Sequence, residues 1–114
     1  MAELLQKMIE ADVIVLATPV YFYAMNGQMK TFIDRTVPQY TKISNKDFYF
    51  IVTSADTIQK HLEKVVEGLR GFAVDCLDNT FEKGVVYGLG AWQKGEIEHN
   101  QEAMRTAYEF GKNV

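Results

Sequence analysis

The sequence of 114 residues is long enough for one hydrophobic core and too short for two. Hydrophobic residues make up 47% and charged residues 24%, as in an ordinary soluble globular domain. The net charge of −3 excludes the basic surface expected of a protein that binds nucleic acid or an anionic membrane.

Apolar runs are far shorter than the roughly 20 residues that a membrane span requires. The first residues lack the basic start and apolar core of a secretory signal, and a single cysteine cannot form an internal disulfide. We therefore expect one cytoplasmic domain over residues 1–114.

The first predicted elements are a helix and a strand. Residues 1–10 carry four apolar side chains on one helical face. Residues 13–17 form a β-branched run without polar alternation, which predicts a strand buried on both faces in a parallel sheet. Thr18 and Pro19 are expected to end this strand, because proline cannot donate to a ladder.

The middle of the chain repeats this alternation. Residues 26–27 offer a helix start, and residues 48–52 predict a second strand. Asp56 or Thr57 can cap the next helix, which has the clearest apolar period in the chain and is expected to end near Gly71.

The last third is less regular. Residues 73–77 and 85–87 are strand candidates around an acidic stretch, and they predict one edge strand interrupted by an insertion. A final helix is expected near residues 100–112, with one packed side formed by Ala103, Met104, Ala107 and Tyr108. Alternating helices and strands indicate an α/β fold with a mostly parallel sheet.

In such sheets, ligands bind outside the carboxyl ends of the strands. Residues 18–27, 53–57 and 88–95 follow the predicted strands and are the candidate site segments. The first holds three adjacent aromatic residues that cannot all point into one core. Aromatic faces and exposed backbone amides suit a flat heterocycle with polar edges, whereas a loop packed against a partner subunit would have the same composition.

Residues 11–22 and 27–35 contain an Ala-Asp pair, an apolar run, Pro19 before Tyr21, Lys30 after Gly27, and an Asp-Arg pair. This pattern resembles the flavodoxin-like NAD(P)H-dependent FMN reductase family. The resemblance implies a three-layer α/β sandwich, FMN as cofactor, NAD(P)H as hydride donor and a small acceptor such as a flavin or quinone.

By that resemblance, residues at the carboxyl ends of three predicted strands would bind the flavin. The implied cofactor-binding residues are Thr18, Pro19, Val20, Tyr21, Phe22, Tyr23, Ala24, Thr53, Ser54, Ala55, Tyr87 and Gly88. No catalytic side chain and no metal ligand is implied, because the flavin performs the chemistry.

The family's first strand, Ser/Thr-rich phosphate loop, helix and second strand have no counterpart in this sequence. The match corresponds to the C-terminal two-thirds of such a domain. Losing three phosphate-loop hydrogen bonds would cost on the order of 5–9 kcal/mol of binding. The missing neighbour would leave the strand at residues 13–17 with an open edge, so we expect a homo-oligomer.

Other residues carry weaker signals. Lys30, Asp34 and Arg35 are expected to be structural, Cys76 to be a buried thiol in a strand, and His61 and His99 to lie on the surface. One cysteine cannot hold the iron–sulfur cluster found in some relatives of the family. Trp92 is either a lid over a flavin or a packing residue.

The sequence therefore predicts an FMN-dependent oxidoreductase. The alternative is a truncated, non-catalytic remnant or a fragment of a flavoprotein that oligomerises without binding flavin.

Overall fold

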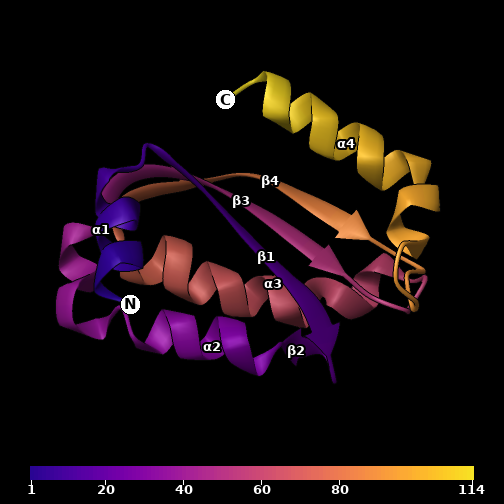
Figure 1. Cartoon of the computed structure of the whole chain (residues 1–114), viewed down its shortest axis with the longest axis horizontal. Helices are drawn as coiled ribbons and strands as arrows, with labels where there is room; N and C mark the ends of the chain where they lie inside the picture. Colours follow the sequence, from indigo (N-terminus) through magenta and orange to yellow (C-terminus); the bar gives the residue numbers. More distant parts are fainter.

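The computed structural model describes residues 1–114 as one four-stranded sheet with helices on both faces (Figure 1). The strand order is β2-β1-β3-β4. Strands β1 (Val13–Tyr21), β3 (Ser44–Thr53) and β4 (Asp78–Gly88) run parallel, and the short β2 (Ala24–Met25) folds back antiparallel onto the end of β1. The α/β fold with a mostly parallel sheet is thereby confirmed.

Helical segments connect and cover the strands. In chain order they are α1 (Ala2–Glu10), α2 (Gly27–Asp34), η1 (Val37–Lys42), η2 (Gln59–Leu62), α3 (Glu63–Arg70), the π-helix η3 (Gly71–Cys76), η4 (Glu96–His99) and α4 (Gln101–Lys112). Asn26 caps α2 by accepting the Met29 N–H at 2.9 Å, and Asn100 caps α4 by accepting the Ala103 N–H at 3.0 Å. These two predicted helix starts are confirmed. The helix start predicted at Asp56 or Thr57 is wrong, because Asp56 accepts the Ile58 N–H within the loop, and η2 and then α3 begin only at Gln59 and Glu63.

The core lies on the face of the sheet that α3 covers. From the central strand β3, Phe48, Phe50 and Val52 are completely buried. Val66 and Leu69 of α3 are also fully buried in the same cluster, as the period of the sequence predicted. This packing fixes the position of the strand ends that carry the candidate site.

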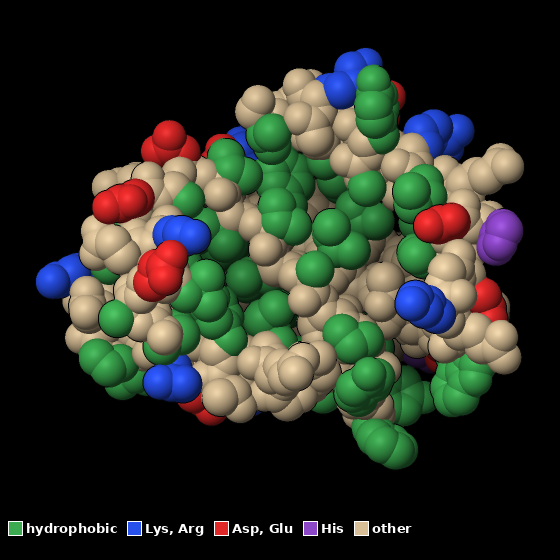
Figure 2. All heavy atoms as spheres, viewed as in Figure 1, with side chains coloured by type: hydrophobic (Ala, Val, Ile, Leu, Met, Phe, Trp, Pro, Cys, Tyr) green, Lys and Arg blue, Asp and Glu red, His purple; other side chains and the backbone are tan.

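The opposite face is only partly covered, which corrects the expectation that β1 is buried on both faces. Leu16 is 3% exposed, whereas Val15 is 52% exposed. The reason is that α4 packs over β3 and β4, where the Phe110 ring lies 5.4 Å from the Tyr49 ring, and leaves β1 open. Figure 2 shows hydrophobic side chains gathered in the hollow between α4 and β1.

Residues 73–76 are helical and Leu77 follows as a bend, so the strand predicted over residues 73–77 is wrong. Gly71 has φ −54°, and the chain continues from α3 into η3 instead of ending at this glycine. Thr80 Oγ1 donates to the Ala73 carbonyl at 2.6 Å and satisfies one of the acceptors that the wide π-turn leaves free. Cys76 is exposed at the end of this turn, which corrects its predicted burial.

The predicted insertion in the last strand is also wrong, although the strand does lie at the edge of the sheet. β4 pairs with β3 from Ser44–Asp78 to Thr53–Gly88. Phe48 pairs with Glu82 and Tyr49 with Gly84, so Lys83 is one extra residue, a bulge. A single bulged residue accounts for the irregular pattern that the sequence shows.

Two further expectations are wrong, one about the end of β1 and one about the packed side of α4. β1 continues through Pro19 to Tyr21, because proline is tolerated where a strand has a free edge and β2 pairs only with the last two residues. Met104 and Tyr108 of α4 are 48% and 67% exposed, and Ala103 and Phe110 make the packed side instead.

Lys46 is buried, although it is charged. Its Nζ donates to the carbonyls of Ile9 at 2.8 Å and Ala11 at 2.5 Å, so it binds the C-terminal end of α1 to β3. None of the helices combines the length and the apolar character that a membrane span requires.

Candidate functional site

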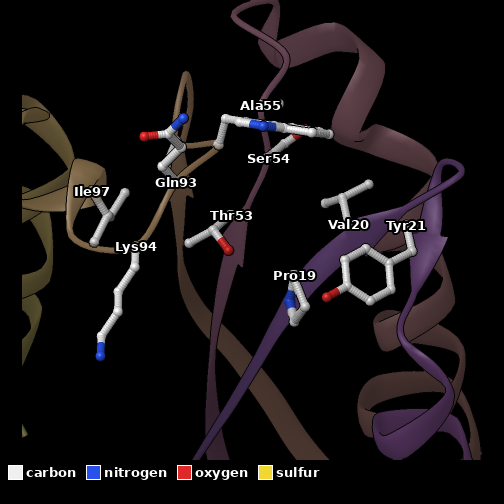
Figure 3. Close-up of a pocket in the computed structure, with 11 residues that line it drawn as sticks. Pro19, Val20, Tyr21, Thr53, Ser54, Ala55, Gln93, Lys94 and Ile97 are labelled. Atoms are coloured by element: carbon white, nitrogen blue, oxygen red, sulfur yellow. The ribbon is translucent and has the colours of Figure 1, made fainter.

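A cavity of about 510 Å³ opens at the carboxyl ends of β1 and β3 (Figure 3). One wall comes from the end of β1, with Pro19, Val20 and Tyr21. The other comes from the loop between β4 and η4, and the residues that follow β3 lie between them. This is the edge where parallel α/β sheets bind ligands.

The aromatic segment forms a tight hairpin between β1 and β2. Phe22 and Tyr23 are its two central residues, with φ of 52° and 65°. Positive φ at both positions defines a turn that normally requires asparagine and glycine. Two bulky aromatic residues in this conformation store backbone strain, which in proteins gathers at functional sites.

Thr18 and Asn26 hold the base of this hairpin. The Thr18 side chain is buried, and its Oγ1 accepts the Asn26 N–H at 3.1 Å. The hairpin therefore projects from a fixed base, with Phe22 fully exposed at its tip and Tyr21 60% exposed on the cavity wall.

The loop after β3 is bonded to the loop after β4. Ser54 N–H donates to the Gly88 carbonyl at 2.9 Å, and Ala91 N–H donates to the Ser54 carbonyl at 2.8 Å. The Ala55 N–H, at the cavity, donates no hydrogen bond within the chain. An unused backbone donor at a cavity wall is available to a ligand.

Gly88 permits the close approach of these loops. A Cβ at this position would lie 2.7 Å from Ile97 Cδ1 and 2.9 Å from Thr53 Cγ2. Beyond it, Glu96 accepts the N–H groups of Trp92 and Gln93, which shapes the loop that closes the cavity.

The structure brings six of the predicted site residues to the cavity: Pro19, Val20, Tyr21, Thr53, Ser54 and Ala55. The other six do not line it. Thr18 supports the hairpin, Phe22, Tyr23 and Ala24 form its tip and return strand, Gly88 lies beneath the loops, and Tyr87 contacts α3.

Five lining residues were not among the predicted cofactor-binding residues: Ala91, Trp92, Gln93, Lys94 and Ile97. The first four fall within the candidate segment 88–95, and Trp92 was also named as a lid or packing residue, whereas Ile97 lies beyond that segment. Trp92 is 77% exposed at the cavity, so it is a wall residue rather than a packing residue. Lys94 is the charged side chain among the lining residues.

Two titratable groups near this edge are perturbed. The pKa of Asp56 is lowered, first by the hydrogen bond from the Ile58 N–H and then by the bond to His61. Burial, with the hydrogen bond from its hydroxyl to Glu63 at 3.0 Å, raises the pKa of Tyr87 to about 12.

A second cavity of about 330 Å³ lies between α2, η1 and the α3–η3 segment. Its lining is largely apolar, with Cys76 and the Lys30–Asp34 ion pair of 2.5 Å among it. The ion pair stays within α2 and its side chains are exposed. No three His, Cys, Asp or Glu side chains of the chain are grouped as metal ligands.

The sequence profile of the family described as NADPH-dependent FMN reductase matches residues 1–104. The chain belongs to this family. The match includes both walls of the first cavity and all the strands, so the FMN reductase family covers the complete candidate site.

Two regions of "Iron-sulfur flavoprotein" sequences from Archaeoglobus fulgidus are similar to this FMN reductase family member. One is 29% identical over 127 residues, which covers 98% of this chain and 62% of the relative. The other is 50% identical over 38 residues and covers 33% of this chain. The chain thus spans about three-fifths of the length of the first relative.

Solved structures share the fold. The Trp repressor binding protein from Bacillus subtilis is 22% identical, with a TM-score of 0.82 over 93% of this chain and 67% of that one. An NADPH-quinone reductase from P. pentosaceus is 15% identical, with a TM-score of 0.76 over 99% and 74%. These likenesses confirm a flavodoxin-like architecture.

The residues of the first cavity fit a flavin ring. Its volume lies in the usual range for small-molecule sites, its walls carry aromatic faces, and Ala55 offers a free backbone donor for a polar ring edge. An iron–sulfur cluster does not fit, because Cys76 is the single cysteine and clusters take several thiolates.

Proposed function

We propose that the protein binds FMN through its ring in the cavity at the carboxyl ends of β1 and β3 and acts as an NAD(P)H-dependent oxidoreductase on a small acceptor. The observation that carries the proposal is this aromatic, amide-bearing cavity in a chain that matches the FMN reductase family over residues 1–104. Bound FMN supplies hydride transfer from the nicotinamide to the acceptor.

The residues of the chain bind and orient the ring. Tyr21 and Val20 give one apolar wall, Trp92 gives another, and Ala55 would donate its unused N–H to the polar edge of the ring. The strained hairpin keeps Tyr21 at the cavity, because its base is fixed by Thr18. Binding of the flavin ring requires no proton transfer from a side chain.

A flavin fluorescence titration with two matched variants tests the ring site. Tyr21→Ala removes an exposed tyrosine from the cavity wall, and Tyr108→Ala removes an exposed tyrosine from α4. We expect quenching of FMN by the wild type, about tenfold weaker binding for Tyr21→Ala, and no change for Tyr108→Ala. Absence of quenching at millimolar FMN, or equal effects of both variants, contradicts the proposal.

The phosphate makes a small contribution in this proposal. Lys94 is the single charged side chain that lines the cavity, which leaves few groups among the lining residues to bind a phosphate. We expect riboflavin and FMN to quench at similar concentrations. Quenching by FMN alone would reveal a phosphate anchor and contradict this part of the proposal.

The proposal includes a partner at the edge of β1. β2 pairs only with Val20 and Tyr21, so the edge over residues 13–19 has no neighbouring strand within the chain. Such an apolar edge favours pairing with another strand, and a second copy of this chain is the occupant that we propose. Sedimentation should show a homo-oligomer, and a monomer at micromolar concentration would overturn this assignment.

A further inference from the structure

The Asp56–His61 pair lies beside the ring cavity and has no role in flavin binding as proposed. Asp56 Oδ1 accepts the Ile58 N–H at 2.9 Å, and Asp56 Oδ2 lies 2.6 Å from His61 Nδ1. The Asp56 backbone is also fixed, because its carbonyl accepts the Gly90 N–H at 2.9 Å. With Nδ1 engaged, Nε2 is the imidazole nitrogen left for a ligand.

A separate cavity of about 240 Å³ contains this pair. Its walls come from the hairpin, the loop after β3 and η2, and are formed by Val20, Phe22, Tyr23, Ser54, Asp56, His61 and Leu62. Val20 and Ser54 also line the ring cavity, so the two cavities adjoin. A molecule over the outer edge of the ring site therefore has room to extend toward His61.

The charged and titratable groups around His61 come from three elements. Asp56 bonds to it from the loop, the Tyr23 ring from the hairpin meets it edge to face at 6.2 Å, and the Lys64 ammonium from α3 lies 5.4 Å from the Tyr23 ring centroid. Asp56 orients the imidazole through its contact with Nδ1, as a carboxylate does for a catalytic histidine.

We propose that this adjoining cavity holds the oxygen-bearing end of the acceptor and that His61 donates a proton to that oxygen from Nε2. Asp56 is then a positioning residue. The acceptor class is a quinone-type carbonyl compound, because such an oxygen must be protonated when the ring is reduced. This inference rests on the proposed function for its source of electrons.

The atoms and electrons balance for a quinone. Conversion to the hydroquinone adds two electrons and two protons, of which a hydride equivalent brings both electrons and one proton. The second proton comes from the His61 imidazolium, whose N–H bond breaks as the O–H bond of the product forms. Neutral His61 then takes up a proton from solvent.

Two acceptors separate this role from a structural one. Duroquinone needs protons on reduction, whereas ferricyanide takes electrons alone. We expect His61→Gln to slow duroquinone reduction by about 10²-fold with little change in ferricyanide reduction, and exogenous imidazole to restore part of the loss. His99→Gln, which removes an exposed histidine from η4, should change neither rate. Equal loss with both acceptors would overturn the proposal.

NMR of the flavin-free chain supplies a readout that needs no turnover. Duroquinone should shift the His61 imidazole resonances, with the larger change at Nε2, and leave those of His99 in place. In Asp56→Asn the Nδ1 resonance should change, since its carboxylate partner is gone. An unshifted His61 at saturating duroquinone would overturn the assignment of the cavity.

Failure of the role proposed for His61 can be distinguished from failure of the proposed flavin binding. If flavin is not quenched by the wild type, the flavin proposal fails, while the NMR experiment still tests the acceptor cavity. If flavin binds equally to wild type and His61→Gln and duroquinone reduction is unchanged, the role of His61 fails and the flavin site stands.

Discussion

The interior of the sheet and its carboxyl edge are built in different ways. On the α3 side, Phe48 and Phe50 of β3 are completely buried and ordinary strand geometry suffices. At the edge, Phe22 and Tyr23 are exposed and hold positive φ angles. Aromatic residues therefore stabilise the fold where they are buried under α3. In the hairpin, aromatic residues cost backbone strain and remain accessible to a ligand.

The largest expected effect comes from a matched pair of phenylalanines. Phe50→Ala should lower the free energy of unfolding by about 3–5 kcal/mol, because it leaves a cavity in the core. Phe22→Ala removes a fully exposed ring and should change it by less than about 0.5 kcal/mol. Urea unfolding of both variants measures the difference, and similar losses would contradict the division between interior and edge.

A smaller effect is expected at Lys46, a charged residue of the interior. Lys46→Met should lower the free energy of unfolding by about 2 kcal/mol, because it removes two hydrogen bonds to the carbonyls of Ile9 and of Ala11, which caps α1. Lys83→Met, at an exposed bulge position of β4, is the control. Equal denaturation midpoints for Lys46→Met and the control would show that the buried contacts contribute nothing.

Relief of strain at the edge should give a gain of stability. Replacing Phe22 by Asn and Tyr23 by Gly supplies the residues that this hairpin turn prefers. We expect the free energy of unfolding to rise by about 1 kcal/mol, which thermal or urea denaturation can detect. A destabilised double variant would mean that the two aromatic rings stabilise the fold more than their backbone strain costs.

The last prediction is a pH dependence of the free energy of unfolding that comes from Tyr87. Its pKa is raised from 10.0 to about 12, so its neutral form is favoured in the folded state. The resulting stabilisation is fully present below pH 10 and is lost as the pH rises through about 12. Subtracting the ultraviolet titration of Tyr87→Phe from that of the wild type should reveal one late-titrating phenol. A normal titration would contradict the Tyr87–Glu63 contact.

Much of the interior could be predicted from the sequence. The apolar run at residues 13–17, the aromatic strand at 48–52 and the period of α3 specify buried elements, since burial imposes regular patterns. Cys76 was misplaced because Gly71 looked like a helix stop, whereas tertiary contacts such as Thr80 to Ala73 continue the chain into a π-helix. Val15 was misplaced because burial depends on what covers the sheet.

The edge was predictable as a location but not in its geometry. The segments after the strands and the aromatic run were identified, and six predicted residues do line the cavity. The positive φ angles of Phe22 and Tyr23 leave no sequence signal, because residues that favour such turns are absent. The Asp56–His61 contact depends on the path of the loop between them, which no local pattern specifies.

The most direct test of the ring site is to map riboflavin onto the backbone by two-dimensional amide NMR. The account predicts shifts concentrated at Tyr21, Ala55 and Gln93, around the carboxyl-edge cavity. The apolar cavity beside Gly68 and Phe72 should stay unaffected. Shifts centred on that second cavity, or no shifts at saturating riboflavin, would contradict the central claim.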